Sequence, residues 1–120
     1  MATKKAYRFI NAQTVSATTN YDVRQLDPVE EDLHLFVKYG TYSGSGNLTF
    51  ILQHSPDNSN WFDYATTSAI SSSDGAQLIV PSAIYVKPEP YIRIRAVAAG
   101  GTPNLTNVTA ECRVGTMTEK

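Results

Sequence analysis

The stretch from Leu52 to Ala65, LQHSPDNSNWFDYA, gathers several side chains that could do chemistry. His54, Ser55 and an aspartate, Asp57 or Asp63, are the residue types of a hydrolase triad, whose base must lie within hydrogen-bond reach of its nucleophile. His54 and Ser55 are neighbours on a predicted strand, so their side chains point to opposite faces. No Gly-x-Ser-x-Gly elbow accompanies this serine. We therefore predict no catalytic residue here and no enzymatic activity.

The same stretch places Asp57, Ser59 and Asp63 at odd positions, as a calcium loop does. The sixth position, where that loop needs glycine, holds Phe62, and no terminal bidentate glutamate follows. Only two carboxylates remain as ligands. We therefore predict no metal site and no cofactor.

A turn is the simplest interpretation of the stretch SPDNSN. Pro56 presets φ at the second position of a turn, Asp57 and Asn58 favour the following positions, and Ser55 can cap it. We predict a hairpin loop between two strands, in which Pro56 and Asp57 are structural. Trp61, the only tryptophan of the chain, is then a buried packing residue at the end of the hairpin.

Apolar side chains recur with a period of two, and Gly, Pro, Asn and Ser separate the segments. One face of each segment is apolar and the other polar, which is typical of antiparallel sheets packed face to face. We predict an all-β antiparallel sandwich or jelly roll of about seven to nine short strands. It forms one domain over residues 1–120, with 1–5 and 117–120 as loose ends. The clearest strands are 32–40, 47–55, 91–98 and 107–115, and the weaker ones are Tyr7–Gln13, Tyr21–Leu26, Trp61–Thr67, Gln77–Val80 and Ile84–Lys87. Loops are predicted at 41–47, 68–76 and 98–104.

The strand NVTAECRVG shows the cleanest alternation and places Cys112 on its apolar face. A buried cysteine behaves as a small hydrophobe, so we predict an unreactive thiol. His34 lies on the polar face of its own strand and is predicted to be solvated. Phe36 shares that polar face and is the first choice for a contact with another chain.

The exposed charges of two strands have two interpretations. Arg93 and Arg95 share one face, and Glu111 and Arg113 share another. If the two strands pair, cross-strand ion pairs explain all four residues. The alternative is a patch that contacts a partner.

Composition excludes several classes of partner. Ten basic residues face eleven acidic ones, without a block of like charge, so we predict no binding to nucleic acid or to a membrane surface. No run approaches transmembrane length. The one cysteine permits no intrachain disulfide, and no apolar segment of signal-peptide length follows Lys4 and Lys5. We expect synthesis in a cytoplasm.

The order of motifs over residues 31–115 resembles small β-sandwich structural proteins of tailed bacteriophages. In that pattern a strand ending QxSxDxxxW is followed, some thirty residues later, by YxRxR and a closing strand. The matching residues are Gln53, Ser55, Asp57 and Trp61, then Tyr91, Arg93 and Arg95.

The resemblance implies a non-enzymatic component of the virion, most like a decoration or cement protein on the capsid surface, made in the host cytoplasm. Its partner would be the major capsid protein, and it would assemble as a homo-oligomer, a trimer or a dimer. The interface residues we predict are Phe36, Tyr91, Arg93 and Arg95.

Two alternatives remain open. One is a carbohydrate- or receptor-binding module of a tail fibre or adhesin, with Trp61 as a stacking platform beside Asp57, Asn58 and Asn60. The other is a tail, neck or baseplate subunit. Burial of Trp61 discriminates the structural role of this residue from the sugar-binding one.

Overall fold

Ten antiparallel strands make up the described part of this computed structural model, which comprises residues 3–26, 30–80 and 88–116. Their bounds are β1 Thr3–Val15, β2 Thr19–Asn20, β3 Arg24–Gln25, β4 Glu30–Tyr39, β5 Tyr42–Gly44, β6 Asn47–Ser55, β7 Phe62–Thr66, β8 Gly75–Ile79, β9 Tyr91–Ala99 and β10 Pro103–Thr116. Within these ranges no helix is long and apolar enough to cross a membrane.

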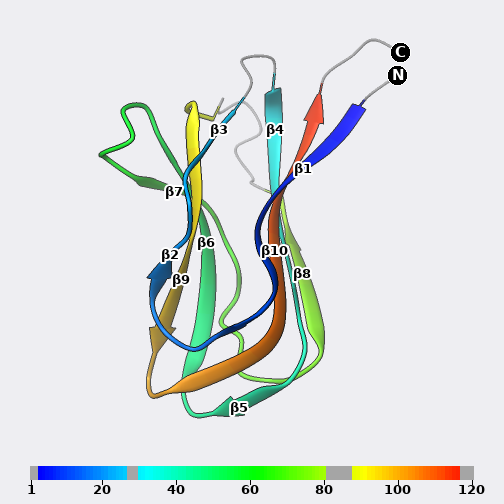
Figure 1. Ribbon diagram of the computed structural model, residues 1–120, viewed down its shortest axis with the longest axis vertical. Coiled ribbons are helices and arrows are strands. Elements are labelled where there is room, and N and C mark those ends of the chain that lie inside the picture. The colour runs from blue at the N-terminus through cyan, green and yellow to red at the C-terminus, as the bar shows by residue number, and fades with distance from the viewer. Residues whose placement is uncertain (1–2, 27–29, 81–87, 117–120) are drawn as a thin grey trace.

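The strands form two sheets that lie face to face (Figure 1). The first, called the β10 sheet, has the order β1-β10-β4-β8, and β5 also pairs with β10. The second, called the β9 sheet, has the order β2-β9-β6-β7, and β3 also pairs with β9. All pairings between these strands are antiparallel. The predicted all-β antiparallel sandwich is confirmed.

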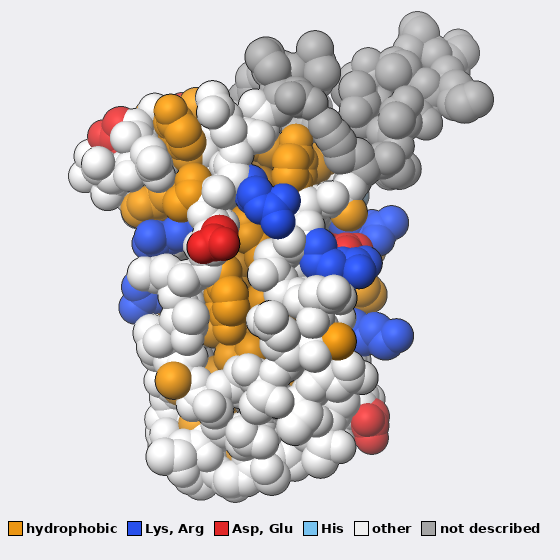
Figure 2. Space-filling view, viewed as in Figure 1, with side chains coloured by type: hydrophobic (Ala, Val, Ile, Leu, Met, Phe, Trp, Pro, Cys, Tyr) orange, Lys and Arg blue, Asp and Glu red, His pale blue; other side chains and the backbone are white. Residues whose placement is uncertain are grey.

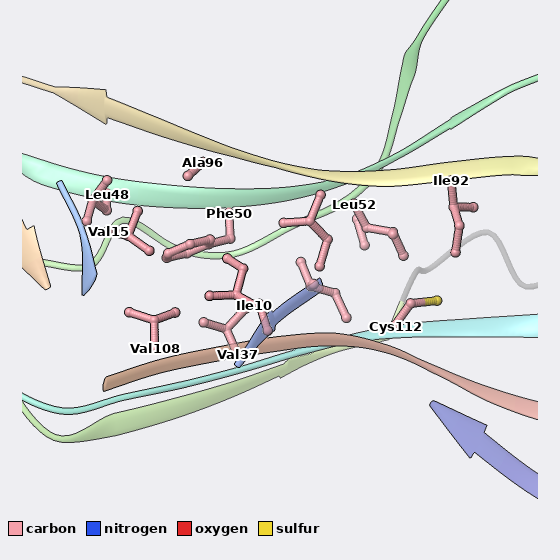
Figure 3. Close-up of a cluster of buried hydrophobic side chains, with 14 of the residues drawn as sticks. Ile10, Val15, Val37, Leu48, Phe50, Leu52, Ile92, Ala96, Val108 and Cys112 are labelled. Carbon is pink, nitrogen blue, oxygen red and sulfur yellow. The ribbon is translucent and has the colours of Figure 1, made fainter. Parts of the chain in front are cut away.

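The apolar faces of both sheets meet in a single core. Leu48, Phe50 and Leu52 point from β6 toward side chains of the β10 sheet such as Val37 and Val108 (Figure 3). Phe50 is the largest of the fully buried side chains. Hydrophobic side chains are also visible between the two sheets in the middle of the space-filling view (Figure 2). The period-two pattern of the sequence thus corresponds to one buried layer between two sheets.

The register of the closing strand is the one that the alternation predicts. Val108, Ala110, Cys112 and Val114 are all fully buried. Cys112 faces the core beneath Ile92 (Figure 3). The predicted burial of Cys112 is confirmed.

The thiol of Cys112 should therefore react with a maleimide only after denaturant is added, because the native core excludes the reagent. Labelling is followed by mass spectrometry at increasing urea concentration. Rapid labelling of the native protein would show that the strand is shifted by one residue, since such a slip turns every side chain to the other face.

Some predicted boundaries are wrong. The predicted loop 41–47 contains β5, which pairs Gly44 with Pro103. The segment Tyr21–Leu26 contributes only the two-residue strand β3, and β2 lies just before it. Residues 3–5 belong to β1, so that part of the predicted loose end is ordered into the sheet. Residues 1–2, 117–120 and the predicted strand Ile84–Lys87 lie outside the described residues.

Of the two interpretations of the charged strands, cross-strand pairing is excluded. β9 and β10 lie in different sheets, so Arg93 and Arg95 cannot meet Glu111 and Arg113 across a ladder. Glu111 is on the outer face, as predicted, but it is only 2% exposed. It accepts from Arg8 Nε at 3.1 Å and from Arg113 Nη1 at 2.7 Å. Long arginine stems cover apolar and polar neighbours alike, which accounts for the burial of this carboxylate.

Candidate functional site

The outer face of the β9 sheet brings together residues that are some forty positions apart in the chain. Because β6 and β9 pair antiparallel, Gln53 lies opposite Arg93, Ser55 opposite Tyr91, and Ile51 opposite Arg95. β7 adds Asp63 beside Gln53. We call this surface the arginine face and define it by six residues: Gln53, Trp61, Asp63, Tyr91, Arg93 and Arg95.

A linked set of contacts holds Arg93 in place. Its guanidinium carbon lies 4.3 Å from the centroid of the Trp61 ring. Its Nε donates to Gln53 Oε1 at 2.8 Å, and Gln53 Nε2 donates to Asp63 Oδ1 at 2.8 Å. A cation over an indole face is the most favourable cation–π geometry. Trp61, Gln53 and Asp63 together therefore fix both the position and the plane of the Arg93 side chain.

Arg95 follows on the same outer face and is also half-buried. Its Nη1 donates to Asn20 Oδ1 at 3.4 Å, a long hydrogen bond. Burial and, secondarily, the charge of Arg95 lower the pKa of Arg93. Lys and Arg side chains project from the left edge of the molecule, over the β9 sheet (Figure 2). The arginine face thus carries two like charges close together.

The turn beside this face is built around Asp57. Its Oδ1 accepts from the backbone N–H groups of Asn60 at 2.8 Å and Ser59 at 3.0 Å, and its Oδ2 accepts from Asn60 Nδ2. Ser55 Oγ also donates to Asp57 Oδ1 at 3.0 Å. These hydrogen bonds, led by the Asn60 backbone N–H, lower the pKa of Asp57 well below its usual range. Asp57 is therefore the residue that orders the turn, and its oxygens are already occupied by the turn itself.

Asp57→Asn should destabilise the protein at neutral pH. The difference in unfolding free energy between wild type and variant should shrink in acid. A carboxylate with a depressed folded pKa stabilises fully above its unfolded pKa of about 3.9, and the stabilisation is lost as pH falls through the folded pKa. Urea unfolding of wild type and variant from pH 7 to pH 2 measures the difference. We expect a constant gap above about pH 5 that shrinks below about pH 4.

Ser59→Ala is the control, because it keeps both the carboxylate and the backbone N–H at position 59 and should follow wild type at each pH. A gap between wild type and D57N that stays constant down to pH 2 would contradict the hydrogen-bonded turn.

The candidate triad is not assembled. His54 Nδ1 accepts the backbone N–H of Glu89 at 3.0 Å, and its ring packs edge-on against Tyr64, with centroids 4.9 Å apart. Burial lowers the pKa of His54, and the charge of Glu89 partly offsets this. Ser55 is buried in the adjacent turn network with Asp57. The histidine and the serine therefore serve different neighbours on different sides of β6.

No group of three or more His, Cys, Asp or Glu side chains within the described ranges could hold a metal ion. The stretch 57–63 in particular is a hydrogen-bonded turn followed by a strand, and Asp57 and Asp63 bind different partners. Asp57 and Asp63 therefore do not form a common set of calcium ligands.

Trp61 differs from its prediction. It is half-buried and lies outside the core, with Arg93 against its ring. The prediction of a buried packing tryptophan is therefore wrong as to depth, although the residue does pack at the end of the hairpin. The guanidinium also occupies a ring face that a sugar would need for stacking, and Asp57 and Asn60 are bound to each other.

Phe36 does not join the other predicted interface residues. It lies on the outer face of the β10 sheet, directly opposite Leu78 of β8, whereas Tyr91, Arg93 and Arg95 lie on the β9 sheet. Phe36 is half-buried, and Leu78 and Val80 are 55% and 54% exposed. We call this second surface the apolar edge and define it by Phe36, Ala76, Leu78 and Val80. The predicted interface thus splits into two surfaces on opposite sides of the sandwich.

Sequence reasoning missed Asp63 and Gln53 as supports of Arg93, and Leu78 as the neighbour of Phe36. The alternation of each strand did place Gln53 and Arg93 on outward faces. It carried no signal for which outward faces become neighbours, because the partners are separated by 40 residues or more along the chain.

No protein-family model matches the chain, and no curated protein matches it closely enough to be a relative. Among solved structures, it is similar to PirA at 13% identity and a TM-score of 0.48, over 95% of this chain and 93% of that chain. It is also similar to FLHE at 12% identity and a TM-score of 0.41, over 98% and 97%. At these low TM-scores, neither likeness carries an argument about function.

Proposed function

We propose that this protein is a non-catalytic structural component of a tailed-phage virion that binds the assembled head as a decoration protein, with the major capsid protein as its partner. The observation that supports the proposal is the arginine face. Three of the residues that carry the phage resemblance, Gln53, Trp61 and Arg93, form one connected network on the outer face of the β9 sheet. The motif residues thus form an ordered surface, and a protein that acts by binding requires such a surface.

The supporting contacts favour recognition because they remove side-chain freedom before binding. Arg93 is held by a ring on one side and a hydrogen bond at Nε. Ordering a long side chain at an interface costs about 0.5–1.5 kcal/mol, so a side chain that is already ordered binds more tightly. Arginine and tryptophan are also the residues that most often dominate interface energetics.

The apolar edge supports a homo-oligomer. β8 ends the β10 sheet, and within the described ranges no strand pairs with its outer side. Its sequence, GAQLI, has no charge and no proline, and its ladder to β4 has no bulge. β1, at the other edge, has three register shifts. Proteins usually protect sheet edges by such devices, so the unprotected β8 edge is suited to pairing with a second copy.

Antiparallel pairing of two β8 edges joins two copies about a two-fold axis, so between a trimer and a dimer it favours the dimer. The two arginine faces would then lie on one particle, and a dimer could engage two capsid subunits. Binding at the second subunit becomes intramolecular, which multiplies the overall affinity. A protein that binds only the expanded form of the shell stabilises that form by mass action.

Leu78→Lys should convert a dimer into a monomer, because a charge on an edge strand opposes pairing with another chain. Light scattering of the purified protein measures the mass. Val23→Lys is the matched control, since Val23 is also an exposed apolar residue, at 40%, but lies between β2 and β3. A monomeric wild type, or a dimer that survives L78K, would contradict pairing through β8.

The function itself is tested by co-sedimentation with phage heads assembled from a major capsid protein, the partner that the proposal names. We expect pelleting with expanded heads at a fixed stoichiometry per capsomer and little pelleting with unexpanded ones. A protein that ignores both forms would overturn the decoration role and would favour a tail, neck or receptor-binding one.

A further inference from the structure

Part of the Arg93 side chain has no hydrogen-bond partner among the described residues. A guanidinium has five N–H donors, and the Nε donor is the one bound to Gln53. No hydrogen bond joins the Nη groups of Arg93 to a residue in the described part of the chain. The fork that recognises carboxylates is therefore held in a fixed plane, and no described residue binds its Nη groups.

No carboxylate of the described residues forms an ion pair with Arg93 or Arg95. The ion pairs between described residues involve Glu111 with Arg8 and with Arg113, on the other sheet. On the arginine face, Asp63 accepts from the Gln53 amide, and Asp57 is saturated by its own turn. Arg95 has a single long hydrogen bond to the neutral Asn20. Two adjacent cations that have no ion pair with a described carboxylate favour the binding of an anion.

The spacing of the two arginines indicates how far apart the negative charges of the ligand should lie. Arg93 and Arg95 are two positions apart on one strand, which places them about 6.8 Å apart along its axis. In an extended peptide, side chains at positions i and i+2 also lie on one face with the same spacing. An acidic segment in extended conformation can therefore match both arginines at once.

We propose that the arginine face is a docking site for an extended acidic segment of a partner protein, in which carboxylates at alternate positions contact Arg93 and Arg95. The proposal rests on the proposed function only in taking this face as the contact surface. The partner is defined by chemistry, and a capsid subunit is one protein that could supply such a segment.

Trp61 provides the measurement, because it is the only tryptophan of the chain and lies against Arg93. Its emission is followed at low ionic strength while the capped peptide TEVET is added to the full-length protein. The peptide TEEVT has the same charge with its glutamates on opposite faces, and TQVQT has no charge. We expect a saturable change with TEVET, binding of TEEVT that is several-fold weaker, and no response to TQVQT.

Two variants locate the site. Arg93→Lys keeps the charge but loses the planar fork, and should weaken TEVET binding about tenfold, as expected for one bidentate charge-assisted contact. Lys38→Arg, on the outer face of the other sheet, is the matched control and should bind as wild type does. Thermal unfolding of each variant checks that it is folded. The comparison of TEVET with TEEVT needs no variant at all.

Three results would overturn the proposal. They are no emission change with TEVET, equal binding of TEVET and TEEVT, and tighter Arg93-dependent binding of an oligodeoxythymidylate, which would indicate a nucleic-acid surface instead. Failure of shell binding with TEVET binding intact would refute the virion role alone. Shell binding by the wild type without any response to TEVET would refute the docking site alone.

Discussion

Phe50→Ala should lower the free energy of unfolding by about 3–5 kcal/mol, the range for deleting a buried phenylalanine and leaving a cavity. Phe50 is fully buried between the two sheets, among side chains from both (Figure 3). Leu48 and Leu52 flank Phe50 on the inner face of β6 and are also fully buried, so they hold the two sheets apart beside the cavity. The loss is measured from the midpoint and slope of urea unfolding, which separate a change in stability from a change in the unfolded state.

Phe62→Ala is the matched control, because the same side chain is 55% exposed at the start of β7. Substitutions at such positions stay within about 0.5 kcal/mol of wild type. Equal effects of F50A and F62A, both below about 1 kcal/mol, would contradict the packing of the sandwich around Phe50.

Gly46→Ala should destabilise the protein by about 2–5 kcal/mol, the sum of left-handed strain of about 1–2 and overpacking of about 1–3. Gly46 has φ of +78° in the turn before β6, and its carbonyl accepts the Tyr42 hydroxyl at 2.6 Å. A Cβ at this position would collide with the carbonyl oxygen of Ala99 and would lie 2.7 Å from the backbone nitrogen of Gly101. Neither is the end of a flexible side chain, so the turn itself must shift.

Gly100→Ala separates the two causes. Gly100 has nearly the same φ, +75°, but a Cβ there would meet only the Cα of Gly46, at 3.5 Å. It should therefore cost only the strain, about 1–2 kcal/mol. Equal losses for G46A and G100A in urea unfolding would contradict the close approach of the two turns.

The two-residue alternation was enough to predict the fold class and the core. It placed Val108, Ala110, Cys112 and Val114 inward, and all four are fully buried. A half-buried strand must expose one face and bury the other, so its pattern carries this information locally.

The identity of neighbouring strands was not predictable in the same way. The pattern of YIRIRAVA says which side chains face outward, but it does not say whether the strand pairs with 47–55 or with 107–115. Strand pairing depends on contacts between distant parts of the chain and on the turns that close them. For this reason the sequence left open whether Arg93 meets Glu111 across a ladder, and in the structure Arg93 meets Gln53.

Trp61 and Glu111 show a second limit of sequence-based prediction. The burial of a side chain depends on which residues of other segments lie over it. Trp61 follows a turn that places it beside the sheet, so its ring packs against Arg93 and stays out of the core. Glu111 faces outward but is covered by Arg8 and Arg113 from either side. From residue type and alternation alone, Trp61 was expected to be buried at the end of the hairpin and Glu111 to be exposed, but Trp61 is half-buried and Glu111 is 2% exposed.

Competition for a limiting number of expanded heads measures whether the arginine face binds the capsid. Wild type and Arg93→Gln are mixed in equal amounts, sedimented with the heads, and quantified by mass spectrometry in the pellet. Lys38→Gln, which removes one positive charge from the other sheet, competes with wild type in a parallel tube. We predict a pellet enriched about tenfold in wild type over R93Q, as for loss of one interface anchor, and an even ratio with K38Q. An even ratio of wild type to R93Q would show that Arg93 does not contribute to capsid binding. The absence of protein from the pellet would show that the chain does not bind the heads.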